Sequence, residues 1–350
     1  MTDRNQQVPP PAAGWWLYDG TGRPGGATDA GDWPEPPHWR AFHGGPDLPP
    51  PPDYPDETAR RLGVPGMVRP DRNQLDVINA ALLLFRPLLV TGRPGAGKSS
   101  LAYQLARDLG LGRVLHWPIT SRSNLRSGLY DYDAIGRAQA AAERPAGDQT
   151  AAGPESTLGE FIHLGPLGTA LLPHRRPRVL LIDELDKSDI DLPNDLLNVF
   201  EDGTFSIPEL IRARNRMPAV EVHTADPGHR AVIRDGVVTC HVFPIVVITS
   251  NGERDFPAPF LRRCIRLDLP DPDEHRLADL VSAHFPGTDE NARQLIRTFI
   301  ERRGARGPLA ADQLLNAIFL AVSGAHATGN EADWTRLLET VWRNLSATGV

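Results

Sequence analysis

The sequence predicts an α/β domain with a central parallel sheet flanked by helices, followed by an all-α domain. Val179–Ile182 and Ile245–Ile248 are continuously apolar, as expected for central strands that are covered on both faces. Shorter strand-like runs at Leu88–Thr91 and Val114–Trp117 alternate with segments of helical spacing. After Pro272 the chain shows helical patterns alone. Strands that alternate with helices, and then helices only, are typical of this arrangement.

Apolar spacing and helix-breaking residues place the individual elements. A helix over 74–82 is broken by Pro87, ahead of the strand Leu88–Thr91. A second helix is expected from Lys98 to about 109, where Gly110 ends it. Toward the C-terminus the apolar spacing predicts four helices, near Glu274–His284, Glu290–Arg302, Ala310–Val322 and Glu331–Ser346.

The composition of two further segments predicts a β-hairpin and a surface insertion. Val220–His223 and Val237–Cys240 alternate apolar and polar residues, and Arg234-Asp235-Gly236 has the composition of a turn. These runs predict the two arms of a β-hairpin over about 220–240. Upstream, residues 137–159 are rich in Ala, Gly and Pro, which indicates a surface insertion.

The first 55 residues are rich in proline and glycine, including a run at Pro49–Pro52, and such composition favours extended structure. Disordered tails are poor in aromatic residues, yet several tryptophans lie here. They are Trp15, Trp16, Trp33 and Trp39. We therefore expect residues 1–55 to form an irregular arm that packs tryptophans on a folded surface, its own or a neighbour's. A flexible linker is the alternative. The α/β domain is expected over 56–271 and the helical domain over 272–350.

Charge and cysteine content exclude several classes of protein. The chain of 350 residues has a formal net charge of −7, and its Lys and Arg are scattered, so a nucleic-acid partner is not expected. Cys240 and Cys264 are too few for a disulfide framework and fit a reducing cytosol. We find neither an N-terminal apolar run typical of a signal peptide nor an apolar stretch of membrane-spanning length. A cytoplasmic location without membrane contact is the expectation.

The segment Gly92–Ser99 has the spacing G-x-x-x-x-G-K-S of a phosphate-binding loop, between a predicted strand and a predicted helix. Its glycines let backbone N–H groups turn toward phosphate oxygens at a helix N-terminus. Lys98 is placed to reach the β- and γ-phosphates, and the Ser99 hydroxyl is a Mg²⁺ ligand. ATP and Mg²⁺ are therefore the expected ligands. The residues expected to bind the nucleotide are Gly92, Arg93, Pro94, Gly95, Ala96, Gly97, Lys98, Ser99 and Ser100.

Polar residues end the two buried strands, and both ends are expected beside the phosphate-binding loop. Asp183 ends the first strand, where it can hold a Mg²⁺-bound water, and Glu184 can polarise the attacking water. Asn251 follows the second strand and is placed to hydrogen-bond the γ-phosphate or the lytic water. Asn251-Gly252 alone would read as a turn, and its position after Asp183-Glu184 favours the functional interpretation.

These motifs, in this order, resemble the AAA+ superfamily of ATPases. The runs 182–187, 192–197, 249–254 and 260–264 are similar more narrowly to its MoxR branch, over roughly 56 to the C-terminus. The resemblance implies a homo-oligomeric ring, usually a hexamer, with ATP at subunit interfaces. It also implies a helix-2 insertion within about 121–166, a hairpin before Asn251, and a C-terminal helical lid. Family members typically remodel proteins, often with a von Willebrand factor A-domain partner.

Arg262-Arg263 is the position at which the family places an arginine that acts in a neighbour's site. Arginine is permanently charged and its planar fork matches phosphate geometry. The resemblance favours Arg263 over Arg262 as this residue, and a surface ion pair with Asp268 or Asp271 is the alternative. The family also has an arginine that opens a lid helix, where this chain has Asp312. An acid cannot hold a phosphate, so no residue is assigned to this role. Either Arg303 or Arg306 takes it over, or the lid is coupled to the nucleotide in a different way.

The sequence thus predicts a MoxR-like AAA+ ATPase that hydrolyses ATP to remodel or activate a protein partner. Two alternatives stay open. One is a nucleotide-gated switch or scaffold in a bacterial defence or signalling complex, in which slow hydrolysis only resets assembly. The other is an NTPase motor stimulated by nucleic acid, against which the acidic balance counts.

Overall fold

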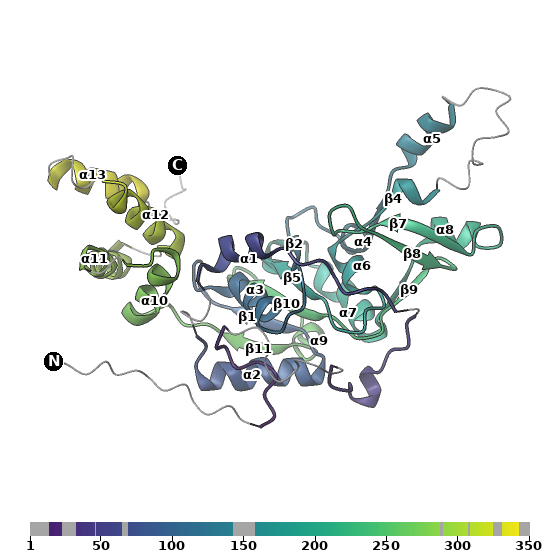
Figure 1. The fold of residues 1–350 in the computed structure, drawn as a ribbon, viewed down its shortest axis with the longest axis horizontal. Helices are drawn as coiled ribbons and strands as arrows, with labels where there is room; N and C mark the ends of the chain where they lie inside the picture. Colours follow the sequence, from purple (N-terminus) through teal and green to yellow (C-terminus); the bar gives the residue numbers. More distant parts are fainter. Residues whose placement is uncertain are drawn as a thin grey trace.

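A five-stranded parallel sheet organises the larger part of the structure (Figure 1). The computed structural model describes residues 14–22, 33–45, 47–64, 69–142, 158–287, 290–306, 309–324 and 331–342. The strand order is β11-β1-β10-β5-β2. The strands are β1 (Leu88–Thr91), β2 (Leu115–Pro118), β5 (Val179–Asp183), β10 (Ile245–Ser250) and β11 (Ile265–Asp268). The predicted central parallel sheet is confirmed, and β5 and β10 lie inside it as their apolar runs indicated.

Helices pack against this sheet and carry the connections between its strands. α3 contacts β5 and β10, α6 contacts β2 and β5, and α2 contacts β11. α2 begins at a capping box in which Asp71 and Gln74 satisfy each other's backbone N–H groups. The helices of this part are α1 (Pro55–Leu62), α2 (Arg72–Leu84), α3 (Lys98–Asp108), α6 (Pro166–Ala170), α7 (Leu192–Asp202) and α9 (Ala258–Leu261), with a 3₁₀ turn η3 (Leu185–Lys187) after β5.

A second sheet of six strands lies at one end of the molecule, in the order β3-β4-β7-β8-β9-β6. Only β4 and β7 are parallel neighbours. Its strands are β3 (Tyr130–Tyr132), β4 (Ile162–Leu164), β6 (Thr204–Ser206), β7 (Ala219–His223), β8 (Arg230–Arg234) and β9 (Val237–Thr239). The elements beside it are α4 (Leu125–Leu129), α5 (Ala134–Ala142), η2 (Leu158–Phe161) and α8 (Pro208–Ala213). The region expected to hold an insertion, 121–166, thus supplies β3, β4, α4 and α5, and its residues 143–157 lie outside the described part.

The structure differs from the predicted hairpin over 220–240. β7 pairs with β8, from Ala219↔Arg234 to His223↔Arg230, and β8 turns at Asp235-Gly236 into β9. The two predicted arms therefore do not pair with each other, because the intervening β8 separates them. Asp235 and Gly236 both have positive φ, which a tight hairpin turn requires. The turn was placed correctly, but it joins β8 to β9.

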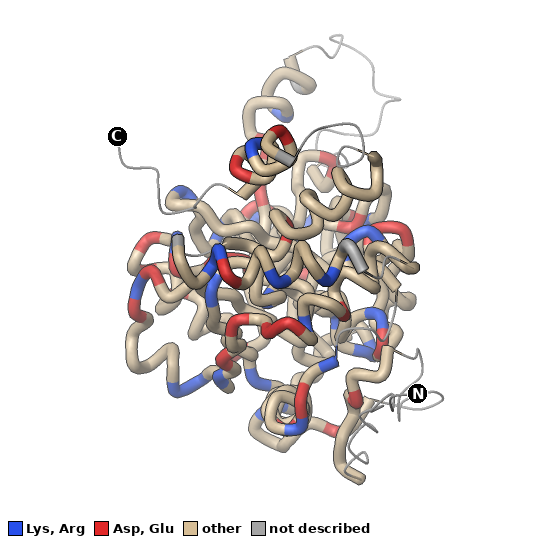
Figure 2. The backbone as a smooth tube through the Cα atoms, turned by 90° about the vertical axis from the view of Figure 1, so that its left-hand side faces the viewer, with Lys and Arg blue, Asp and Glu red and all other residues tan. Residues whose placement is uncertain are grey.

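The C-terminal helices form a separate buried cluster, from Leu277 to Trp342, while the α/β cluster ends at Leu269. The expected boundary at 271–272 falls between the two. The helices are α10 (Glu274–His284), α11 (Glu290–Arg306), α12 (Ala311–Val322) and α13 (Glu331–Val341), at one end of the view in Figure 1. We call this unit the lid. Figure 2, seen from the lid side, shows basic and acidic residues interspersed.

The N-terminal segment packs on the α/β domain of its own chain. Trp16 and Trp33 are each 6% exposed, whereas Trp15 and Trp39 are 45% and 64% exposed. The Asn79 side chain holds the backbone of Tyr18 through its amide oxygen and nitrogen, at 2.9 and 2.8 Å. Farther along, a 3₁₀ turn η1 (His38–Arg40) precedes the rest of the arm. Residues 1–13, 23–32 and 46 lie outside the described part.

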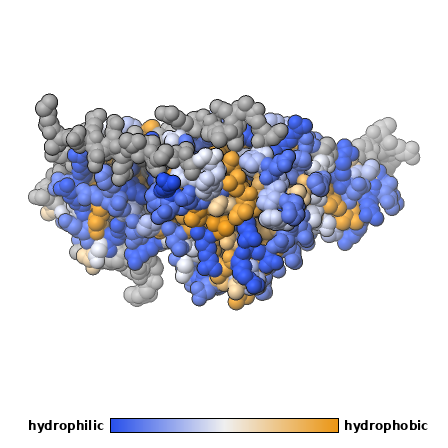
Figure 3. All heavy atoms as spheres, turned by 90° about the horizontal axis from the view of Figure 1, so that it is seen from below, coloured by the Kyte–Doolittle hydropathy of each residue, from blue (hydrophilic) through white to orange (hydrophobic). Residues whose placement is uncertain are grey.

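Hydrophobic residues also gather on one outer face. Figure 3 views the molecule from below and shows an apolar band across its middle, between hydrophilic flanks. Within the described ranges, no helix is both long and apolar enough to cross a bilayer.

Candidate active site

The predicted site residues meet at the carboxyl ends of β1, β5 and β10. The chain leaves β1 through α3 toward β2 at one edge of the sheet, whereas it leaves β10 toward β11 on the other side of β1. The two connections run past each other in opposite directions, so the strand order reverses between β1 and β10. The carboxyl ends of strands beside such a reversal are where α/β proteins bind ligands. The phosphate-binding loop follows β1, and Asn251 follows β10.

The glycines of the loop are required by its backbone. Gly92, Gly95 and Gly97 have φ values of 151°, 81° and 89°, a range that other residues rarely adopt. A Cβ atom on Gly92 would lie 2.7 Å from the Leu269 carbonyl oxygen, and one on Gly95 would lie 2.4 Å from the Ala311 backbone nitrogen. The loop therefore sits tightly between β11 and the lid, and α3 begins directly after it at Lys98.

Lys98 is buried and turned back over the loop. Its ammonium donates to the carbonyl oxygens of Gly92 and Arg93 at 2.7 and 2.9 Å and to Asn251 Oδ1 at 2.8 Å. Burial lowers the pKa of Lys98, an effect opposed by the charges of Asp186, Glu184 and Asp183. A cation held among acceptors beside a phosphate-binding loop is placed to contact phosphate oxygens.

Asp183 receives hydrogen bonds from three side chains. Ser99 Oγ and Thr249 Oγ1 each donate to Oδ1 at 2.7 Å, and His116 Nε2 lies 3.2 Å from Oδ2. Burial alone would raise the pKa of Asp183, but hydrogen bonds from His116, Thr249 and Ser99 outweigh it and lower the pKa to about 2. The carboxylate is thus held charged and fixed in orientation at neutral pH.

Glu184 stands one residue further on, in a left-handed conformation with φ 61°. Its backbone N–H donates to Thr249 Oγ1 at 2.8 Å. Its carboxylate accepts from Lys187 Nζ at 2.6 Å and from Asn251 Nδ2 at 3.2 Å, and 40% of the side chain is exposed. A strained backbone conformation persists where surrounding hydrogen bonds hold it, and here the bond from the Glu184 N–H to Thr249 Oγ1 holds it.

Asn251 connects the cation and the acid of the site, because its side-chain oxygen accepts from Lys98 and its nitrogen donates to Glu184. Asp186 fixes the segment that carries it. Asp186 Oδ2 accepts the backbone N–H groups of Asn251 and Glu253 at 2.8 and 3.0 Å, and the carboxyl is 3% exposed. The asparagine is therefore held from its backbone as well as from its side chain.

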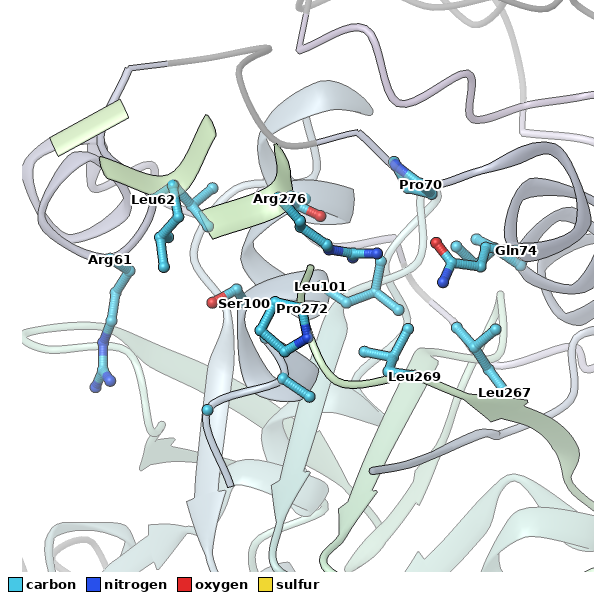
Figure 4. A pocket seen from close by; sticks show the side chains of 16 residues that line it. Arg61, Leu62, Pro70, Gln74, Ser100, Leu101, Leu267, Leu269, Pro272 and Arg276 are labelled. Carbon is cyan, nitrogen blue, oxygen red and sulfur yellow. The ribbon is translucent and has the colours of Figure 1, made fainter. Parts of the chain in front are cut away.

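A pocket of about 680 Å³, including its solvent-open part, adjoins the loop (Figure 4). Gly95, Gly97 and Ser100 form its floor, and the other walls come from α1, α2, β11 and α10. Figure 4 shows Arg276 extending across the pocket toward Pro70, whereas Arg61 points away from it. The lining is largely apolar, through Leu62, Ile78, Leu101, Leu267, Leu269 and Leu280. Its apolar walls beside the loop suit a planar heterocycle attached to phosphates in the loop.

The two arginines predicted at the end of α9 lie away from these residues. Arg263 donates to Glu201 and, at 3.3 Å, to the Pro259 carbonyl oxygen, and Arg262 is exposed. Both precede β11, whose first residue pairs with the start of β1, so they lie at the amino edge of the sheet, opposite the loop. Within one chain they do not join the site. The predicted alternative, an ion pair with Asp268 or Asp271, is wrong for Arg263, whose partner is Glu201.

The remaining loop residues have separate surroundings. Arg93 is exposed and pairs with Asp271 at 3.1 Å, and Ser100 faces the adjoining pocket. From the lid, Ala311 meets Gly95 and Arg303 lines a small cleft beside Arg93, where it donates to the Pro272 carbonyl oxygen at 2.9 Å. Asp312 is exposed, and the Arg306 side chain lies outside the described part.

Sequence reasoning assigned no role to Thr249, His116, Asp186 or Lys187. Thr249 and His116 are polar residues inside apolar strands, and that interruption is a signal visible in the sequence. Their partners are set by strand register, because β2 and β10 flank β5 on its two sides. Asp186 and Lys187 lie in η3, whose tight turn after Glu184 brings them back toward the site.

The oxygen atoms of Ser99 and Asp183 suit a magnesium ion, which prefers oxygen ligands and takes few of them from protein. They lie 2.7 Å apart, beside the loop that would hold phosphates. Within the described ranges, including this site, His, Cys, Asp and Glu form no group of three or more arranged to hold a metal ion.

Comparisons with known proteins identify no family for this chain. No family model matches the sequence, and no curated protein matches it. A structural match is NtrX from Brucella abortus in complex with ADP, at 12% identity and a TM-score of 0.30, covering 72% of this chain and 60% of NtrX. The match thus spans less than two thirds of that protein. A TM-score this low supports no argument, so the fold and site described above stand on their own geometry.

Proposed function

We propose that the protein is an ATPase whose active site is built from the residues after β1, β5 and β10. The observation that carries the proposal is one hydrogen-bonded network that joins Lys98, Ser99, Asp183, Glu184 and Asn251. It brings together a cation, a hydroxyl, an acid of lowered pKa and a second, exposed acid. These groups are what phosphoryl transfer to water requires beside a phosphate-binding loop.

Each residue has a defined task in this proposal. Backbone N–H groups of the loop and the Lys98 ammonium bind and orient the phosphate oxygens of the substrate. Ser99 and Asp183 would hold Mg²⁺, which neutralises phosphate charge when bound. Glu184 accepts the proton of the attacking water, and the Asn251 amide orients that water or the terminal phosphate. The apolar pocket beside the loop takes the base.

The finer proposal is a MoxR-like AAA+ ATPase that works as a ring, usually a hexamer, and remodels a protein partner. The order of the sequence motifs supports it, as does the helical lid that touches Gly95 of the loop. A ring also gives a use to Arg263, because that residue lies at the sheet edge opposite its own site. A von Willebrand factor A-domain protein is one candidate partner, by the same resemblance.

A nucleotide-gated switch is the second candidate, and one contact favours it. The ammonium of Lys187 lies 2.6 Å from a carboxylate oxygen of Glu184, the residue proposed as general base, and forms an ion pair with it. Lys187 must move away before the Glu184 carboxylate can accept the proton of the attacking water, and this additional step slows turnover. Turnover measured beside partner release separates the two: a remodeller hydrolyses ATP repeatedly for each release, whereas a switch does so once.

The decisive experiment uses Glu184→Gln, which keeps the shape of the side chain but cannot accept a proton. We expect ATP binding to persist while turnover falls about 100-fold or more, the scale of a lost general base. Lys98→Ala is the control that should lose binding as well. Turnover of Glu184→Gln close to that of the unchanged protein would refute the assignment of Glu184, and failure of the unchanged protein to bind ATP would refute the proposed function.

A further inference from the structure

One buried polar side chain faces the pocket that adjoins the phosphate-binding loop. Gln74, on α2, lines this pocket and is 5% exposed. Figure 4 shows its amide group directed into the pocket, on the opposite side from Ser100, which follows the loop. The other polar side chains of the lining are exposed or half-buried; they are Arg61, Ser100, Gln104 and Arg276. With phosphates in the loop, Gln74 lies at the end of the pocket that receives the base.

The orientation of the Gln74 amide is fixed by the cap of its helix. Its Oε1 accepts the Asp71 backbone N–H at 3.1 Å, and Asp71 Oδ1 accepts the Gln74 backbone N–H at 2.9 Å. Because a backbone N–H needs an acceptor, the oxygen and not the nitrogen of the amide faces Asp71. In the described ranges no hydrogen bond uses the amide nitrogen, and this atom is not sealed from solvent. The pocket therefore receives the N–H donors of Nε2 and the second lone pair of Oε1.

We propose that Gln74 reads the nucleotide base and makes the site selective for adenine over guanine, an inference that rests on the proposed function. Adenine presents an amino group and the ring nitrogen N7 side by side, and a glutamine amide binds this donor and acceptor through two hydrogen bonds. Guanine presents two acceptors, O6 and N7, at the same edge. Its O6 would face the amide oxygen, and the buried amide would lose a partner, which is costly.

The competing donor over the pocket is Arg276, from α10 of the lid. A guanidinium group carries donors alone, and these match the two acceptors of guanine. Arg276 is only half-buried, however, and within the described part of the chain no hydrogen bond holds its guanidinium group. Gln74 is buried and held at its oxygen, and a group held in place before the ligand arrives loses less entropy on binding. We therefore assign the selectivity to Gln74.

The test is competition against a fluorescent ADP labelled on its ribose, with the full-length protein and Mg²⁺. Unlabelled diphosphates are used because they carry the same bases and are not turned over. We expect ADP to bind about tenfold or more tightly than GDP, the scale of one bidentate base contact. An ADP analogue with carbon in place of N7 should bind about tenfold more weakly than ADP, because it lacks the acceptor.

Two substitutions separate reading of the base from support of the helix. Gln74→Glu keeps an oxygen for the Asp71 N–H, because glutamate also closes a capping box, but it removes the N–H donors. Gln74→Met removes both. At about pH 8, where the introduced carboxylate is charged, both variants should bind ADP about tenfold more weakly and GDP at most about threefold more weakly. Both should also bind ADP and its N7-lacking analogue about equally, since no donor to N7 remains.

Asn73→Met is the matched control, because Asn73 is an exposed amide on the same helix that does not line the pocket. It should keep the preference for ADP, and thermal melts check that each variant is folded. If Gln74→Glu regains the ADP affinity that Gln74→Met loses, Gln74 acts through the helix cap alone. Equal binding of ADP and GDP by the unchanged protein overturns the inference, and tighter binding of GDP assigns the reading to Arg276. Binding of neither nucleotide refutes the proposed function itself.

Discussion

The Thr249 hydroxyl links the two acids that follow β5. It donates to Asp183 and accepts the Glu184 backbone N–H, both within 2.8 Å, and the residue is fully buried. One side chain on β10 thus holds both the carboxylate of the proposed metal ligand and the backbone of the proposed base. Because such groups are costly to leave unpaired, Thr249 has a larger influence than its distance from the substrate suggests.

Replacing Thr249 with Val tests this role at the scale of one residue. The change keeps the shape of the side chain but leaves the Glu184 N–H without its acceptor, at a cost of about 1–3 kcal/mol in stability. We expect kcat for ATP hydrolysis to fall about tenfold, with a smaller change in KM, because the acids lose their alignment and the binding loop is untouched. The measurement is steady-state hydrolysis together with a thermal melt.

Thr249→Ser is the control for that change. It keeps the hydroxyl and loses a buried methyl group, so it should be destabilised by about 1 kcal/mol yet retain most of kcat. If the Val and Ser variants have the same kcat, the hydroxyl does not organise the acids.

At the scale of elements, strands were predictable where burial is complete. β1, β5 and β10 each begin with three or four consecutive apolar residues, a pattern that indicates a buried strand. Gly110 marks the end of α3 as expected. β11 was missed because it is an edge strand, whose Ile-Arg-Leu-Asp sequence alternates between a buried and an exposed face. The hairpin was mispaired because the ends of β8 are arginines that face solvent, so the strand gave little apolar signal.

The same distinction applies to the site. The loop and the acidic pair are contiguous motifs, and their relative placement follows from parallel strands ending at one edge. Thr249 and His116 reach Asp183 from two different strands, and only the register of the sheet shows that the three side chains meet. Local sequence carries no record of that register, because parallel strands are joined by long connections.

The N-terminal arm offers an element-scale prediction about pH. His174 is buried where the arm crosses the α/β domain, with Leu48 bridging to it and its Nδ1 3.3 Å from the Pro49 carbonyl oxygen. Burial, helped by the charge of Arg178, lowers the pKa of His174 to about 4. The ordinary pKa of a histidine side chain is 6.5. Below this pH, His174 is protonated in the unfolded chain but stays neutral in the folded chain, down to about pH 4.

Stability should therefore fall as pH drops from 6.5 to 4, and a shift of this size corresponds to about 3 kcal/mol in the free energy of unfolding. His174→Gln removes the titrating group. Urea unfolding followed by tryptophan fluorescence should show the stability of the unchanged protein falling relative to the variant across this range. A constant difference between the two proteins at pH 4 and pH 7 would contradict the prediction.

At the scale of the whole molecule, the central sheet separates two surfaces that one chain cannot bring together. The loop and the network around Asp183 lie at the carboxyl edge, and Arg263 lies at the amino edge. An arginine that stabilises the transition state must reach the phosphates, so within a single chain Arg263 is too far away to act. If chains assemble head to tail, as in a ring, Arg263 of one meets the loop of the next.

Mixing two inactive variants tests this assembly directly. Arg263→Ala should bind ATP but turn it over at least 100-fold more slowly, the scale of a lost transition-state arginine. Lys98→Ala should fail to bind ATP, while its own Arg263 stays intact. In a mixed ring, an intact loop from the first variant can face an intact arginine from the second, so some activity should return on mixing, in proportion to the frequency of such neighbours.

Glu201→Ala is the matched control, because it removes the partner of Arg263 in the same exposed ion pair and should keep turnover. If mixing restores nothing although the two variants co-assemble, Arg263 does not act in a neighbour's site.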